Sequence, residues 1–207
     1  MTQSASKNVL AWWPVLLGPA AIMLVLLTRD SAVGEAIRAH DGGPIPPTLT
    51  LSAGLIALIG AAVRRNELLW LLGALGLLFF LREASVPGSD DHLPGAKKGV
   101  YVGLVVIGVW AYRWRERVRP WIRAAGLFPA LATMCVMYVL SQTIARGGLK
   151  FLSDVLDASG QKMRTPMEES CETVGHLLLL GAVLVGCLTR RPEADGDASD
   201  AGDSDGG

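Results

Sequence analysis

Histidine and cysteine are scarce in this sequence, with three of each among 207 residues, and it has no phosphate-binding glycine loop, nucleophile elbow or His-Glu-x-x-His motif. The cysteines show no zinc-ligand spacing, and Cys171 and Cys187 lie too far apart along one predicted helix to form a disulfide. Seven-helix metal hydrolases need more histidines than this. Membrane cytochromes need paired histidines within spans, whereas only His176 lies in one. These absences exclude the enzyme classes that such motifs identify.

Segments of alternating apolar and polar residues are also absent, which excludes a transmembrane β-barrel. Apolar residues make up 51% of the chain and the mean hydropathy is +0.39, which is too apolar for an ordinary soluble domain. Long apolar runs in lipid satisfy their backbone groups as helices. The sequence therefore predicts an all-α polytopic membrane helix bundle of six transmembrane helices. Their apolar runs are Val9–Leu27, Thr48–Val63, Leu68–Leu81, Gly99–Tyr112, Ala124–Ile144 and Cys171–Leu188.

The formal net charge of zero conceals an uneven distribution of charge. Six of the 19 acidic residues lie beyond Pro192 with no basic residue among them, which leaves thirteen acidic against 19 basic residues in the rest of the chain. The segment after Pro192 is rich in Asp, Gly, Ala and Ser and cannot bury enough apolar surface to fold. We therefore expect residues 1–191 to form the six-helix transmembrane domain and residues 192–207 to form a disordered acidic C-terminal tail.

Basic residues in short loops predict the orientation, because cytoplasmic loops carry an excess of Lys and Arg. No small-x-small cleavage site follows the first run, so we expect it to remain as a membrane helix. With both termini cytoplasmic, the inside connections hold Arg64-Arg65, the Arg113–Arg123 loop and Arg190-Arg191. We expect a multi-pass protein of the cell inner (plasma) membrane. Its predicted partners are membrane lipids, with anionic lipid at the Arg113–Arg123 loop and no nucleic acid.

The last span begins with an unusual group of ionisable residues, which are costly at membrane depth and therefore indicate function. On a helix, Glu168, Glu169, Glu172 and His176 fall within about one quadrant at about 100° per residue. A stripe of small residues runs beside them, and an apolar face predicted to contact lipid lies mostly opposite. The stripe consists of Cys171, Gly175, Ala182 and Gly186, and the apolar face of Val174, Leu177, Leu178, Leu184, Val185 and Leu188. The polar quadrant is therefore expected to face the bundle interior.

Two members of the quadrant have a structural role that accounts for them. Glu168 closes a capping box that starts at Thr165, and Glu169 suits the positive end of the helix dipole. Glu172 and His176 lie deeper, about 5 Å and about 10 Å inside the outer hydrocarbon boundary. Their spacing allows contact, so they form either a mutually satisfied ion pair or a working site.

Other segments bring candidate partners to the same side of the membrane. Arg82 and Glu83 end the third span, and Asp91 and His92 lie in the following loop. The alternative for these residues is a snorkelling anchor and a solvated turn. Further polar residues on this side are Lys97, Lys98, Ser141, Gln142 and Thr143.

Three functions fit this constellation. A divalent metal held by Glu169, Glu172 and His176, with Glu172 and His176 as catalytic residues, would give a metal-dependent membrane hydrolase. A Glu–His relay would serve a small proton- or ion-coupled transporter or channel. A charge network that only braces helices would suit a non-catalytic scaffold subunit. The sequence leaves open whether the protein is an enzyme, what it acts on and its oligomeric state.

Overall fold

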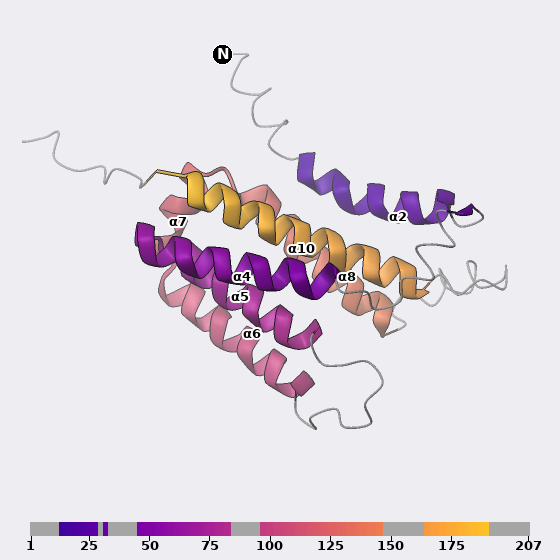
Figure 1. The fold of residues 1–207 in the computed structure, drawn as a ribbon, viewed down its shortest axis with the longest axis horizontal. Helices are drawn as coiled ribbons and strands as arrows, with labels where there is room; N and C mark the ends of the chain where they lie inside the picture. The colour runs from indigo at the N-terminus through magenta and orange to yellow at the C-terminus, as the bar shows by residue number, and fades with distance from the viewer. Residues whose placement is uncertain (1–12, 29–30, 33–44, 84–95, 147–163, 191–207) are drawn as a thin grey trace, which may run out of the picture.

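Helices make up nearly all of the described part of the chain. The computed structural model describes residues 13–28, 31–32, 45–83, 96–146 and 164–190, and no strand occurs within these ranges. The elements are η1 (Trp13–Leu16), α2 (Leu17–Thr28), α4 (Ile45–Arg64), α5 (Glu67–Glu83), α6 (Ala96–Arg113), α7 (Arg115–Ala124), α8 (Phe128–Ala145) and α10 (Arg164–Leu188) (Figure 1). The predicted all-α architecture is confirmed.

Helix α10 is the central element of the bundle, since it contacts α2, α4, α5 and α8. Successive long helices run in opposite directions, so α5 and α8 end where α10 begins (Figure 1). We call this the acidic end. The turn between α4 and α5, helix α7 and the last residues of α10 lie at the opposite end, which we call the basic end.

Three helices are long and apolar enough to cross a membrane: Pro46–Arg64, Phe128–Ala145 and Pro166–Leu188. Gly99–Arg113 is a shorter apolar helix. Large apolar side chains are exposed on their outer surfaces, for example Ile59, Val105 and Val139 at 65–67%. Such a surface is unfavourable in water and suits lipid, so these helices indicate a membrane protein.

The structure adds helical turns that the apolar runs did not predict. The predicted Arg113–Arg123 loop is largely helix α7, and α10 begins at Arg164, seven residues before the predicted apolar run. Thr165, the predicted start of the capping box, therefore lies within the helix. The predicted tail, 192–207, lies outside the described residues.

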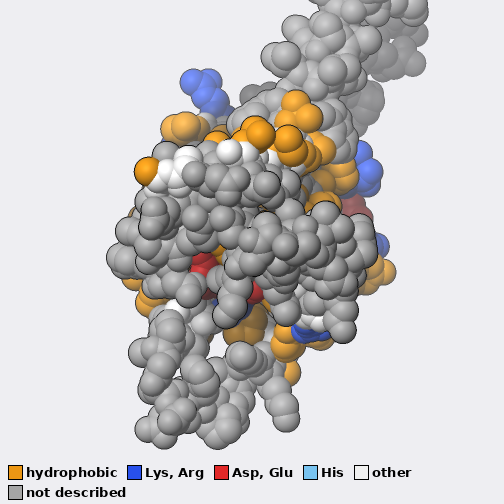
Figure 2. All heavy atoms as spheres, turned by 90° about the vertical axis from the view of Figure 1, so that its right-hand side faces the viewer, with side chains coloured by type: hydrophobic (Ala, Val, Ile, Leu, Met, Phe, Trp, Pro, Cys, Tyr) orange, Lys and Arg blue, Asp and Glu red, His pale blue; other side chains and the backbone are white. Residues whose placement is uncertain are grey.

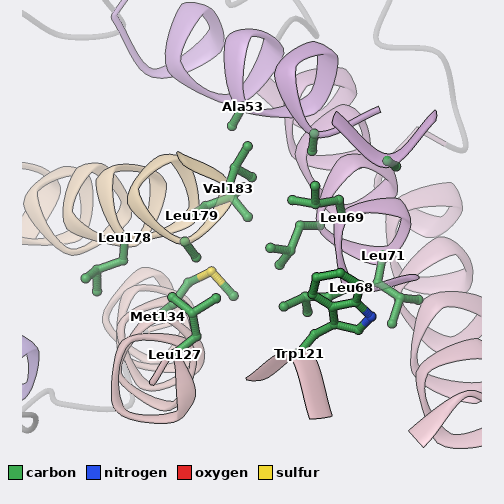
Figure 3. Packing of buried hydrophobic residues seen from close by; sticks show 14 of the residues in the cluster. Ala53, Leu68, Leu69, Leu71, Trp121, Leu127, Met134, Leu178, Leu179 and Val183 are labelled. Atoms are coloured by element: carbon green, nitrogen blue, oxygen red, sulfur yellow. The ribbon is translucent and has the colours of Figure 1, made fainter. Parts of the chain in front are cut away.

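The hydrophobic core lies where α4, α5, α7, α8 and α10 converge. Leu69 of α5 and Leu179 of α10 are fully buried there, together with Met134 of α8 and Trp121 of α7 (Figure 3). Leu178 is also buried, at 8% exposed, so its predicted place on the lipid face is wrong. The reason is that helices pack against α10 on several sides, whereas the prediction gave this helix one interior face and one lipid face.

A tight turn joins α4 to α5 and fixes their antiparallel packing. Arg65 adopts a left-handed conformation with φ of 51°, and Asn66 then caps α5 by accepting a hydrogen bond from the amide of Leu68 at 2.9 Å. The Asn66 amide nitrogen donates to the carbonyl of Gly186 at 3.3 Å, which ties this turn to the end of α10. One buried asparagine thus connects three helices at the basic end.

Candidate functional site

Glu172 is the centre of a buried charged cluster at the acidic end. Its side chain is 10% exposed and forms an ion pair with Arg82, the penultimate residue of α5. The same carboxylate oxygen, Oε1, accepts hydrogen bonds from Ser141 Oγ at 2.7 Å and Gln142 Nε2 at 3.4 Å. Helices α5, α8 and α10 each contribute to this cluster, which we call the charged layer. The carboxylate therefore links the ends of three helices.

An aromatic layer lies one helical turn deeper on the same three helices. Phe79 of α5 and Tyr138 of α8 have ring centroids 4.2 Å apart, and His176 of α10 lies 5.5 Å from Tyr138 and 6.1 Å from Phe79. Gly175 allows the close approach, because a Cβ there would lie 3.0 Å from the Tyr138 ring. The aromatic layer lies between the charged layer and the rest of the hydrophobic core, to which Phe79 belongs and against which Tyr138 packs.

His176 is fully buried, and neither ring nitrogen has a hydrogen-bond partner within the described residues. The hydroxyl of Tyr138 is likewise buried and unpartnered there. The proposed Glu172–His176 pair is therefore wrong, because the Glu172 carboxylate is bound by α5 and α8 instead. Unsatisfied buried polar groups are costly and are commonly retained for a function.

Among the residues that the structure describes, the charged layer has more negative than positive charge. Arg82 Nε lies 3.8 Å from Glu83 Oε1, so a single guanidinium serves two carboxylates, Glu83 and Glu172. Burial raises the pKa of Glu83, and the charge of Glu172 raises it further, while Arg82 opposes the shift. Glu83 therefore holds a proton more readily than an ordinary glutamate does.

The raised pKa of Glu83 predicts how stability depends on pH. A carboxyl whose pKa is higher in the folded than in the unfolded state binds more protons when folded, so stability falls as pH rises from the unfolded to the folded pKa. We expect Glu83→Gln to remove part of the decline in stability above about pH 4.5. The unfolding midpoint of wild type and variant, measured across pH 4 to 8, checks this. A variant that follows the wild-type curve throughout would show that Glu83 ionises freely.

The structure brings some of the predicted site residues together. Arg82 contacts Glu172, and Glu83 lies beside Arg82, whereas Asp91 and His92 lie outside the described residues. Among the residues with described positions, no three His, Cys, Asp or Glu side chains form a group able to hold a metal ion. A divalent-metal site at Glu169, Glu172 and His176 thus stays a prediction from sequence.

Tyr138 and Phe79 are members of the cluster that the sequence pattern did not reveal. Tyr138 precedes Ser141 by three residues, and Phe79 precedes Arg82 by three, so each aromatic ring lies on the same helix face as a polar partner of Glu172. That three-residue spacing was the only feature of the sequence that could have indicated their place in the cluster. An aromatic residue at this position has the same pattern whether it packs in a core or borders a site.

The face at the acidic end shows acidic and basic side chains near its centre (Figure 2). No protein-family model, curated protein or solved structure matches this chain. The charged layer and the aromatic layer beneath it are the features of this chain that point to a function.

Proposed function

We propose that the protein is a small proton-coupled transporter or channel, in which the charged layer binds and releases the coupling proton. The observation that carries this proposal is one arginine between two carboxylates, partly buried where the ends of three helices meet. Two carboxylates that share one cation at low dielectric favour uptake of one proton. A single buried ion pair would have no such excess charge.

Arg82 provides a way to couple protonation to helix movement. When Glu83 is protonated, Arg82 pairs with Glu172 of α10 alone. When Glu83 is ionised, it competes with Glu172 for the Arg82 guanidinium. Because Glu83 and Arg82 are both on α5, this competition weakens the ion pair between α5 and α10. Proton binding would thus favour the closed packing of α5 against α10, and proton release would favour their separation.

The buried His176 and Tyr138 extend the proposal inward from the charged layer. Both lie beneath Glu172, and their polar atoms have no hydrogen-bond partner among the residues that the structure describes. An imidazole and a phenol are both able to pass a proton on, and intramembrane His and Glu side chains are typical members of proton relays. We propose that a proton leaving the charged layer passes to His176.

The proposed topology has six spans in the cell inner membrane, with both termini cytoplasmic. Arginines of short connections concentrate at the basic end, as the orientation rule expects of the cytoplasmic side. The charged layer would then lie in the outer leaflet and take up protons from outside.

A structural brace is the second candidate function. Three donors converge on Oε1 of Glu172, an arrangement that would also hold three helix ends together without transport. The two candidates differ at Glu83, which takes part in proton binding but accepts none of these three hydrogen bonds.

The test is proton flux in liposomes that contain the purified full chain and an internal pH-sensitive dye. Wild type should acidify the lumen under an imposed pH gradient and membrane potential, and Glu83→Gln and His176→Phe should reduce the rate to that of empty liposomes. Glu116→Gln, an exposed acid at the basic end, is the matched control. Circular dichroism establishes that each variant is folded. Wild-type flux equal to that of empty liposomes would contradict transport, and folded variants with full flux would contradict the relay.

A further inference from the structure

Helix α7 is anchored on one face and free on the other. Val118 and Trp121, three residues apart, are both 5% exposed and pack into the hydrophobic core. Trp121 Nε1 also donates a hydrogen bond to Glu67 Oε2 at 3.0 Å, which fixes α7 to the start of α5. The orientation of α7 on the bundle is therefore set, and its opposite face is fixed outward.

That outward face is strongly basic. Glu116 is the only acidic residue between Arg113 and Arg123, and it is paired with Arg115 at 3.1 Å. Arg117 stacks over the ring of Trp114, with 5.9 Å from the guanidinium carbon to the ring centroid. The exposed arginines of this basic face are Arg117, Arg119 and Arg123 of α7, together with Arg113 at the end of α6, whereas the charge of Arg115 is neutralised by Glu116. No ion pair joins any of these four arginines to Glu116.

The basic face lies where apolar helix surfaces end. Val63 at the end of α4 is 76% exposed and is followed by the exposed Arg64 and Arg65. Tyr112 at the end of α6 is 69% exposed and is followed by Arg113. An abrupt change from exposed apolar to exposed basic side chains marks the level of the headgroups, where lipid phosphates are found. Figure 1 shows α7 at the same end of the bundle as the last residues of α4 and α10.

We infer that the basic face of α7 binds the headgroups of anionic phospholipids. Guanidinium groups match phosphate oxygens with two parallel hydrogen bonds, and a helix held rigidly at headgroup level presents several of them at once. A nucleic acid would meet the same charges, but the adjoining apolar surfaces place lipid phosphates beside them already. This inference does not depend on proton transport.

Native mass spectrometry of the full chain in detergent tests the inference. The probes are dioleoyl phosphatidylglycerol and dioleoyl phosphatidylcholine at equal concentration. We expect the wild type to retain phosphatidylglycerol preferentially, and the double variant Arg117→Gln/Arg119→Gln to lower the ratio of the two bound lipids about tenfold. The matched control Arg115→Gln/Glu116→Gln removes a charge pair from the same helix at unchanged net charge and should leave the ratio as in wild type.

Several outcomes would overturn the inference. Equal retention of the two lipids by wild type would do so, as would an unchanged ratio in the double variant with its fold intact by circular dichroism. An equal loss in the neutral-pair control would show that helix integrity, and not charge, sets the ratio. Displacement of phosphatidylglycerol by a short RNA duplex at the same ionic strength would assign the surface to nucleic acid.

Discussion

Replacing Arg82 with methionine should lower the free energy of unfolding by about 3–5 kcal/mol. The reason is that Glu172, only 10% exposed, would lose its counter-ion while it stayed buried between three helices. Ser141 and Gln142 would still donate hydrogen bonds, but neutral donors compensate a buried charge only in part. Equilibrium unfolding of the detergent-solubilised protein by sodium dodecyl sulfate, followed by circular dichroism, measures the change.

Two further variants separate the lost ion pair from a general loss of packing. The double variant Arg82→Met/Glu172→Gln removes both charges and should recover most of the stability, because no unpaired charge is then buried. Arg115→Met breaks the exposed pair with Glu116 and should cost no more than about 1 kcal/mol. If the double variant were as unstable as the single one, the stability would come from the packing of the Arg82 side chain and not from its charge.

The positions of the helices followed closely from sequence, because long apolar runs dominate the pattern. The run Thr48–Val63 lies within α4, which extends from Ile45 to Arg64. The differences occur where the residues are polar. Helix α7 and the first turns of α10 hold many charged side chains, and a search for apolar runs passes over them. Their helical form becomes evident only from periodicity, as with Val118 and Trp121.

The site could be predicted from sequence only in part. Its helix face was identified because carboxylates and a histidine are costly on one side of an apolar helix and are rare there without a function. The direction of each side chain could not be predicted, since spacing along one helix gives proximity but no orientation. Glu172 points to Arg82 and Ser141 on other helices, and His176 packs against Tyr138. Contacts between helices depend on which faces meet, and that is a tertiary property.

The approach of the α4 and α5 backbones at Gly76 gives the second large expected effect. A Cβ at Gly76 would lie 2.8 Å from the backbone nitrogen of Gly54 and 3.1 Å from the carbonyl oxygen of Thr50. Because these are backbone atoms, no side-chain rotation relieves the clash and the two helices must move apart. We expect Gly76→Ala to lower the free energy of unfolding by about 2–3 kcal/mol, measured by the same unfolding titration.

Gly108→Ala is the matched control, because a Cβ at this position of α6 would meet nothing within 4 Å. Alanine is the better helix former, so Gly108→Ala should raise stability by up to about 1 kcal/mol. The same intrinsic gain applies at Gly76, and a net loss there therefore isolates the cost of separating two packed helices. If both variants were stabilised alike, α4 and α5 would not be in backbone contact at Gly76. The position of Arg82 relative to α4 would then be less firmly set, since Arg82 follows Gly76 on α5 by only six residues.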